Sequence, residues 1–197
     1  MNEKIKDSGS TQEFATGAHR DNATGKGRCD LLPLAQASMA MAGDKVLALV
    51  GDFMETRDTI HLANAIRASA ETVPCFHFKS IVDDLASDGV EVKLPQCEHQ
   101  ADEKLRILNA CVAHMLLESS KLYEGGAIKY GANNWMLGMP VNRYIDSGVR
   151  HYLKTLRGDI DEPHYRGFVW NLLCAMWTAE NIPEMNYSEK PVRSNNA

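Results

Sequence analysis

Two arginines and an aspartate in the last third of the chain share the spacing of one helical face. Arg143, Asp146 and Arg150 follow one another at i, i+3 and i+7. Lys154 and Arg157 extend the same face. Arginines beside a carboxylate can hold phosphate oxygens through charge-assisted, often bidentate hydrogen bonds. The alternative is a solvated face whose charges form i, i+3 and i+4 ion pairs.

A turn rich in carboxylates follows, in the segment RGDIDEPHY. Asp159, Asp161, Glu162 and His164 crowd this turn and the start of a helix. Carboxylates beside an imidazole suit a hard divalent cation such as Mg²⁺ or Mn²⁺. The alternative is helix capping, with Asp159 or Asp161 as the N-cap and Glu162 in the first turn. Asp159 and Asp161 are therefore candidate metal ligands.

The loop KYGANNWMLGMP carries residues suited to a nucleotide. Trp135 could stack on a flat base, and Asn134 could hydrogen-bond its polar edge. Lys129 and Tyr130 precede them as candidate substrate-binding residues. The alternative for Trp135 is ordinary packing in the core or in a lid.

Several isolated residues are further candidates for binding or catalysis, on weaker sequence signals. Lys26 and Arg28 lie in the glycine-spaced GKGR, which is not a P-loop because the GxxxxGK[ST] pattern is absent. Glu124 precedes two glycines and is a candidate metal ligand, as is Asp146. Asn171 lies in an apolar segment and needs hydrogen-bond partners if it is buried, which favours a substrate-binding network. His151 or His164 could shuttle a proton or orient a water molecule.

The cysteines suggest one more site. Cys75 and His77, together with Cys97 and His99, could form a Cys₂His₂ zinc site. The C-x-H spacing is tighter than that of usual zinc sites, and ordinary loop residues are the alternative. None of the five cysteines forms a CxxC pair, and we expect reduced thiols.

Bulk composition narrows the class of protein. The 197 residues fit one domain with an insertion, and 44% of them are hydrophobic. The net charge of −5 argues against polymeric nucleic acid and membrane surfaces as partners. No apolar run has the length of a membrane span, and the N-terminus lacks a signal-peptide core. We expect a cytoplasmic protein.

Hydrophobic spacing predicts a mainly α fold, a helical bundle core with a small α/β or helical insertion. The clearest helices are expected over about 105–123, 144–156 and 163–182, and a shorter one over 31–43. Within an insertion at about 44–104, the apolar runs VLALV (46–50) and VEVKL (90–94) read as strands flanking helices at 58–70 and 79–86. The predicted organisation is a polar arm (1–28), one helical domain (29–183) and a flexible tail (184–197).

Five segments together resemble a known family. They are TGAHRD, GKGRCDLLP, EGGAIKYGANNW, GMPVNRYIDSGVRH and GDIDEPHYRGFVWNLLCAMW, in that order. The combination resembles the phage and bacterial dATP/dGTP diphosphohydrolases (N-terminal type), which include the MazZ enzymes of phages that replace adenine with 2-aminoadenine. The resemblance covers roughly 16–37 and 118–180 and leaves the insertion outside. Glu118 and Glu124 do not share a helical face, so the chain lacks the ExxE pair of MazG-like enzymes.

The resemblance implies a metal-dependent pyrophosphohydrolase. Its substrate would be a purine deoxynucleoside triphosphate, cleaved to the monophosphate and pyrophosphate with Mg²⁺ or Mn²⁺. It also implies a homo-oligomer, and a MazZ-type member would supply dGMP for the modified purine nucleotide. Two other functions fit the same residues: a non-catalytic phage protein that binds or sequesters a nucleotide, and a structural helical domain with a salt-bridged surface.

Overall fold

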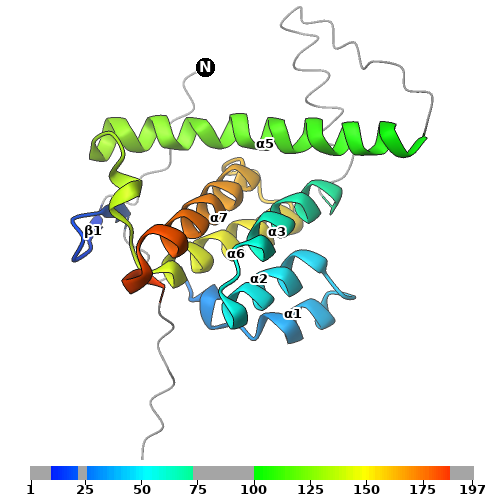
Figure 1. Cartoon of the computed structure of the whole chain (residues 1–197), viewed down its shortest axis with the longest axis horizontal. Helices are drawn as coiled ribbons and strands as arrows, with labels where there is room; N and C mark the ends of the chain where they lie inside the picture. The colour runs from blue at the N-terminus through cyan, green and yellow to red at the C-terminus, as the bar shows by residue number, and fades with distance from the viewer. Residues whose placement is uncertain (1–9, 22–25, 73–99, 187–197) are drawn as a thin grey trace, which may run out of the picture.

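The computed structural model describes residues 10–21, 26–72 and 100–186, and most of them are helical. This confirms the predicted mainly α class. The helices are α1 (Leu34–Ala40), α2 (Lys45–Thr56), α3 (Ile60–Thr72), α5 (Gln100–Tyr130), α6 (Val141–Arg157) and α7 (His164–Asn181). Short 3₁₀ turns are η1 (Cys29–Leu31), η2 (Asn134–Leu137) and η3 (Pro183–Met185). The long helix α5 lies across the other helices and packs on α3 and α7 (Figure 1).

Helices α6 and α7 form the centre of the core, and two glycines let them approach closely. A Cβ at Gly148 would lie 2.9 Å from Leu172 Cδ1, and one at Gly167 would lie 2.8 Å from the His151 ring. Both distances are too short for a real side chain, so these positions require glycine at the observed separation. The contact places His151 of α6 against the first turns of α7.

The apolar run VLALV is helical, so the prediction of a strand at 46–50 is wrong. Val46, Leu47, Val50 and Phe53 are all buried, and they recur with helical spacing along α2. The carboxylate of Asp44 caps this helix by accepting the Leu47 N–H at 2.9 Å. A five-residue window could not reveal this periodicity, because the stripe continues into the more polar GDFMET.

Helices α2 and α3 belong to the same core as α6 and α7. Their buried side chains join one hydrophobic cluster with those of α6 and α7. The Tyr152 hydroxyl of α6 also donates to Asp44 Oδ2 at 2.6 Å. Residues 45–72 therefore complete the bundle rather than form a separate unit. The expected helix at 79–86, the strand at 90–94 and the Cys₂His₂ site lie outside the described residues.

The polar arm contributes an antiparallel hairpin of β1 (Thr11–Glu13) and β2 (His19–Asp21). Thr16 Oγ1 donates to the Gly138 carbonyl at 2.6 Å. The backbone of His19 exchanges two 3.0 Å hydrogen bonds with the Asn134 side chain. These contacts fasten the hairpin to the loop after α5.

The expected helices of the last third are present. Helix α5 is longer than expected because it continues through Gly125 and Gly126 to Tyr130. Helix α7 starts after Pro163, and no side chain caps its N-terminus. Across the described residues, no helix combines the length and apolar character needed to cross a membrane.

Candidate functional site

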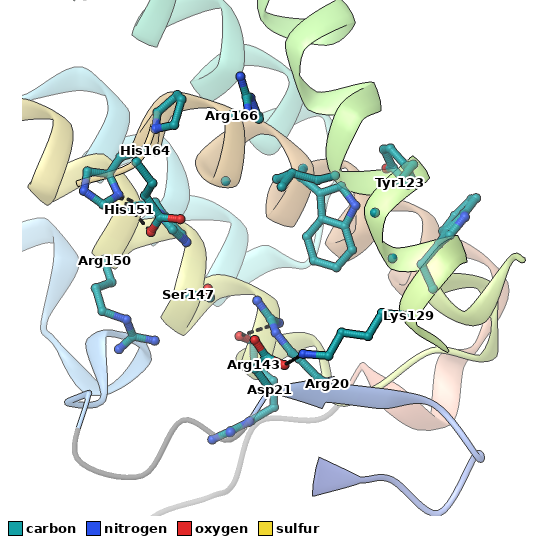
Figure 2. Close-up of a pocket in the computed structure, with 18 of the residues that line it drawn as sticks. Arg20, Asp21, Tyr123, Lys129, Arg143, Ser147, Arg150, His151, His164 and Arg166 are labelled. Atoms are coloured by element: carbon teal, nitrogen blue, oxygen red, sulfur yellow. Dashed lines mark hydrogen bonds and ion pairs between the residues drawn. The ribbon is translucent and has the colours of Figure 1, made fainter. Parts of the chain in front are cut away.

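A pocket of about 1290 Å³ lies among β2, the C-terminal part of α5, the loop that follows it, α6 and the start of α7. Figure 2 shows side chains from these elements directed into it. Cations and aromatic rings line one part of the wall, and a group of histidines and carboxylates lines another. The pocket is large enough for a small charged ligand of nucleotide size.

Arg20 supplies a half-buried positive charge to the pocket wall. Its guanidinium carbon lies 5.7 Å from the ring centre of Tyr144 and 5.5 Å from that of Trp170. Nη2 donates to Asn171 Oδ1 at 2.6 Å, and Nη1 donates to the Arg143 carbonyl at 3.4 Å. No carboxylate of the described residues pairs with it, and burial lowers the pKa of Arg20. A half-buried cation whose partners among these residues are all neutral favours entry of an anionic ligand.

Arg143 and Lys26 add two more cations to the same wall. Arg143 Nη2 donates to the neutral Gln12 Oε1 at 3.3 Å. Within the described ranges, neither Arg143 nor Lys26 pairs with a carboxylate. Together with Arg20 they form a positively charged region, and phosphate groups would neutralise it.

Asp146 and Arg150 form an ion pair within α6. Asp146 is 1% exposed, and its carboxylate accepts from Arg150 Nη2 at 2.7 Å and from the Cys29 N–H at 2.5 Å. Arg150 Nη1 also donates to the carbonyls of Lys26 and Gly27, at 3.0 and 2.9 Å. This pair therefore fastens residues 26–29 to α6. Both residues line the pocket, but the Asp146 oxygens already have three donors.

Three residues proposed to touch substrate also hold the hairpin in place. Lys129 Nζ and the Tyr130 hydroxyl both donate to Asp21 Oδ1, at 2.6 and 2.5 Å. Asn134 pairs with the backbone of His19, as described above. All five residues line the pocket. The loop after α5 thus positions β2, which carries Arg20.

Aromatic rings form the apolar part of the pocket. Trp135, Tyr123 and Trp170 line it. The Trp135 and Tyr123 rings meet edge to face with centres 5.3 Å apart, and Trp135 meets Trp177 at 5.2 Å in the same way. Trp135 therefore packs against the core and presents part of its surface to the pocket. A flat base can stack on such a surface.

Two histidines and two carboxylates meet where α6 approaches the start of α7. His151 Nδ1 and His164 Nδ1 are 3.1 Å apart. His164 Nε2 lies 2.9 Å from Asp161 Oδ1, and Glu162 Oε1 lies 3.3 Å from His164 Nδ1. Burial and the neighbouring His164 lower the pKa of His151 to about 3. The His151 imidazole is therefore neutral near pH 7, and one of its ring nitrogens carries a lone pair.

The remaining candidates lie at the rim of the pocket or outside it. Asp159 lines the pocket and accepts from Arg157 Nε at 2.6 Å. Glu124 is exposed on α5 and does not line the pocket. Arg28 also lies outside, where it forms a bidentate 2.7 Å pair with Asp30. Asn171 lies behind the wall as the partner of Arg20.

Sequence reasoning did not select Arg20, Asp21 or Glu162 as site residues. Arg20 and Asp21 lie in a polar arm with no periodic pattern, and only the short segment TGAHRD marked them. Glu162 belongs to the acidic turn, but its position before a helix also fits an acidic residue of the first helical turn, so the sequence did not single it out. Only the pairing of α6 with α7 shows that Glu162 faces His151 across the turn, at 3.7 Å.

The comparisons agree with the resemblance seen in the motifs. No curated protein and no solved structure matches the chain. The matched family covers α5, α6 and α7, but it excludes the hairpin and helices α1–α3. Residues 96–188 match the family described as dATP/dGTP diphosphohydrolase, N-terminal, which is the family that the motifs predicted.

Proposed function

We propose that this protein is a metal-dependent pyrophosphohydrolase that cleaves a purine deoxynucleoside triphosphate to the monophosphate and pyrophosphate. The family description supports a diphosphohydrolase acting on dATP or dGTP. The resemblance to MazZ-type enzymes puts dGTP first among the substrates. The observation that carries the proposal is Arg20, a half-buried arginine in the pocket wall whose partners in the described part of the chain are neutral.

The pocket divides into regions that match the parts of such a substrate. Arg20, Arg143 and Lys26 would bind phosphate oxygens and neutralise the charge that develops during cleavage. Trp135 and Tyr123 would pack against the base. The histidine–carboxylate group at the start of α7 would orient the attacking water.

The acidic turn fits a divalent cation. The carboxylate oxygens of Asp159 and Asp161 lie within 4.8 Å of each other. Mg²⁺ or Mn²⁺ held there would supply charge neutralisation and lower the pKa of a bound water. Asp146 fits this role less well because its oxygens accept from Arg150 and Cys29, and Glu124 fits less well because it lies outside the pocket.

A nucleotide-sequestering protein is the second candidate. Two observations favour it. Asp146 forms an ion pair with Arg150, and Glu124 lies outside the pocket, so neither carboxylate is placed to bind a catalytic metal ion. It uses the same cationic and aromatic wall but leaves the triphosphate intact.

The test is to incubate the purified protein with each of the eight common (d)NTPs in Mg²⁺, in Mn²⁺ or in EDTA. Products are separated by chromatography. We expect metal-dependent conversion of dGTP or dATP to the monophosphate and pyrophosphate. Intact nucleotides that nevertheless raise the melting temperature would replace the proposal with the sequestering function.

A further inference from the structure

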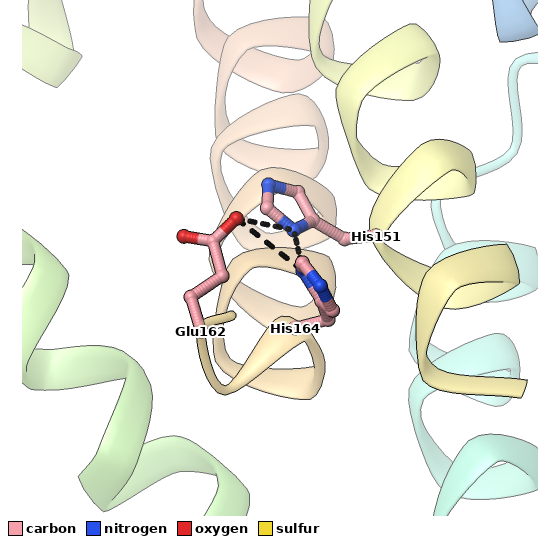
Figure 3. A group of neighbouring side chains, drawn as sticks. All are labelled: His151, Glu162 and His164. Carbon is pink, nitrogen blue, oxygen red and sulfur yellow. Dashed lines mark hydrogen bonds and ion pairs between the residues drawn. The ribbon is translucent and has the colours of Figure 1, made fainter. Parts of the chain in front are cut away.

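The group formed by His151, Glu162 and His164 has the geometry of a nitrogen-containing metal site. His151 comes from α6, His164 begins α7, and Glu162 comes from the turn between them (Figure 3). The two Nδ1 atoms are 3.1 Å apart, and Glu162 Oε1 lies 3.3 and 3.7 Å from them. Ligand atoms bound at 2.0–2.1 Å to a tetrahedral ion lie about 3.3 Å apart. The three separations are close to that value.

Asp161 determines which nitrogen of His164 is available. Its Oδ1 lies 2.9 Å from His164 Nε2, so a neutral imidazole carries its hydrogen on Nε2 and donates it to the carboxylate. The lone pair is then on Nδ1, which faces His151 and Glu162. A carboxylate behind a histidine is the arrangement that orients histidine ligands in many zinc sites.

A hydrogen bond between the two imidazoles does not explain the whole group. Between neutral imidazoles, one hydrogen can bridge the two Nδ1 atoms, but Glu162 Oε1 then lies 3.3 Å from the acceptor nitrogen of His164 with no hydrogen between them. Two electron-rich atoms at that distance repel each other. A metal ion would accept all three ligand atoms at once.

Packing holds two of the ligands in place. The His164 side chain is 1% exposed, and the His151 ring lies against α7 where Gly167 has no side chain. The Glu162 side chain is 33% exposed and lines the pocket, so a fourth position can open toward the substrate. Catalytic metal sites commonly combine three protein ligands with one such open position.

We propose that His151 Nδ1, His164 Nδ1 and Glu162 Oε1 bind a first-row transition ion such as Zn²⁺ or Co²⁺, with Asp161 as the positioning residue. Imidazole ligands favour these ions over Mg²⁺, which prefers oxygen. The role of the ion rests on the proposed function, because a water at the open position would face the phosphate-binding wall. The binding site itself does not depend on that function.

Titration of the metal-stripped full chain with Co²⁺, followed by visible absorption and equilibrium dialysis, tests the site. We expect one Co²⁺ per chain with the intense bands of four- or five-coordinate cobalt. Zn²⁺ should displace it, and excess Mg²⁺ should not. His151→Gln and Glu162→Gln should each weaken binding by at least about tenfold, and Asp161→Asn by about 10–100-fold.

His61→Gln is the matched control, since His61 also faces a carboxylate, that of Asp52, but lies outside the pocket. It should bind Co²⁺ as the wild type does, and circular dichroism should show that every variant is folded. A spectrum of six-coordinate hydrated cobalt would overturn the site. Wild-type affinity in folded His151→Gln and Glu162→Gln would overturn it as well.

A parallel assay of dGTP cleavage in Mg²⁺ separates the two proposals. Co²⁺ binding without cleavage of any nucleotide would leave the metal site standing and overturn the proposed function. Cleavage of dGTP without Co²⁺ binding would support the proposed function and overturn the metal site.

Discussion

The charge of Arg20 indicates what kind of ligand the pocket binds. Its guanidinium lies near the rings of Tyr144 and Trp170 and has only neutral hydrogen-bond partners among the described residues. An incoming phosphate would add a charge-assisted hydrogen bond, which contributes about 1.5–3 kcal/mol. This half-buried charge is thus better explained by an anionic ligand than by the stability of the fold.

Replacing Arg20 tests this explanation. We expect Arg20→Met to weaken the binding of dGTP in EDTA by about 10–100-fold, measured by isothermal titration calorimetry, because the charge-assisted hydrogen bond is lost. The matched control is Arg57→Met, because Arg57 also lies over an aromatic ring, that of Phe53 at 5.6 Å, outside the pocket. Equal affinity in the two variants would contradict an anion-binding role for Arg20.

His151 gives the fold a predictable dependence on pH. Its pKa is about 3 in the folded chain and near 6.5 when unfolded. Between these values the unfolded state binds a proton that the folded state does not. The free energy of unfolding therefore falls as pH is lowered from about 6.5 toward 3, by at most about 1.4 kcal/mol per pH unit from this residue.

Urea unfolding of wild type and His151→Gln at pH 7.5, 6.5, 5.5 and 4.5 measures this contribution. We expect the wild type to lose stability more steeply than the variant below pH 6.5. The values at pH 7.5 are the reference, since both side chains are neutral there. Parallel curves would show that His151 is not the group responsible.

At the scale of elements, the close approach of α6 and α7 positions the histidines. Alanine in place of Gly148 or Gly167 would press on Leu172 or on the His151 ring. We expect each substitution to destabilise the fold by about 1–3 kcal/mol in urea unfolding, as overpacking does. Gly167→Ala should also weaken Co²⁺ binding, because it displaces a ligand.

Gly126 is the matched control for those two substitutions. It lies inside α5, and a Cβ there meets nothing within 4 Å. Gly126→Ala should therefore stabilise the fold by about 0.5–1 kcal/mol, the ordinary preference of a helix for alanine. Destabilisation of similar size at all three positions would contradict a specific role for the α6–α7 contact.

Helices whose apolar stripe runs for several turns could be predicted from the sequence, whereas short apolar runs could not be assigned. Helices α6 and α7 were predicted because their apolar stripes run for several turns. The run at 46–50 was assigned to a strand because five apolar residues fit either structure. Its helical state depends on the Asp44 cap and on the stripe extending to Phe53, so tertiary packing decides it.

At the scale of the whole molecule, the pocket needs parts of the chain that are far apart. Several hydrogen bonds hold the hairpin, and four of them are those of Thr16 to Gly138, two between His19 and Asn134, and Arg20 to Asn171. At about 1 kcal/mol each, these bonds contribute about 4 kcal/mol. The hairpin also brings Arg20 into the wall.

Deleting residues 1–21 should therefore abolish dGTP binding and lower the free energy of unfolding by at least about 4 kcal/mol. Deleting only residues 1–9 is the control and should preserve both properties. Calorimetry and urea unfolding measure the two effects. A chain lacking residues 1–21 that still binds dGTP with wild-type affinity would contradict the assignment of the hairpin to the site.

The candidate site could be predicted only in part, because it is built from segments that are far apart in the sequence. The spacing within α6 and the acidic turn revealed Arg143, His151 and His164, which lie close together in the chain. Arg20 could not be assigned because its partners are remote in sequence. The segment matched to the family, 96–188, also lacks β2, so that segment alone is an incomplete pocket. The homo-oligomer implied by the resemblance stays a prediction.

The distance along the chain between Arg20 and Asn171 has a consequence for biosynthesis. They are 151 positions apart, so at 5–20 residues per second a ribosome takes roughly 8–30 s between them. During that interval the hairpin has no helix α7 to pack against. A polypeptide released early, before α7 is made, would carry Arg20 and its partners on α6 but would lack Trp170 and Asn171. Such a product would have an incomplete pocket, and its incomplete core would mark it for degradation.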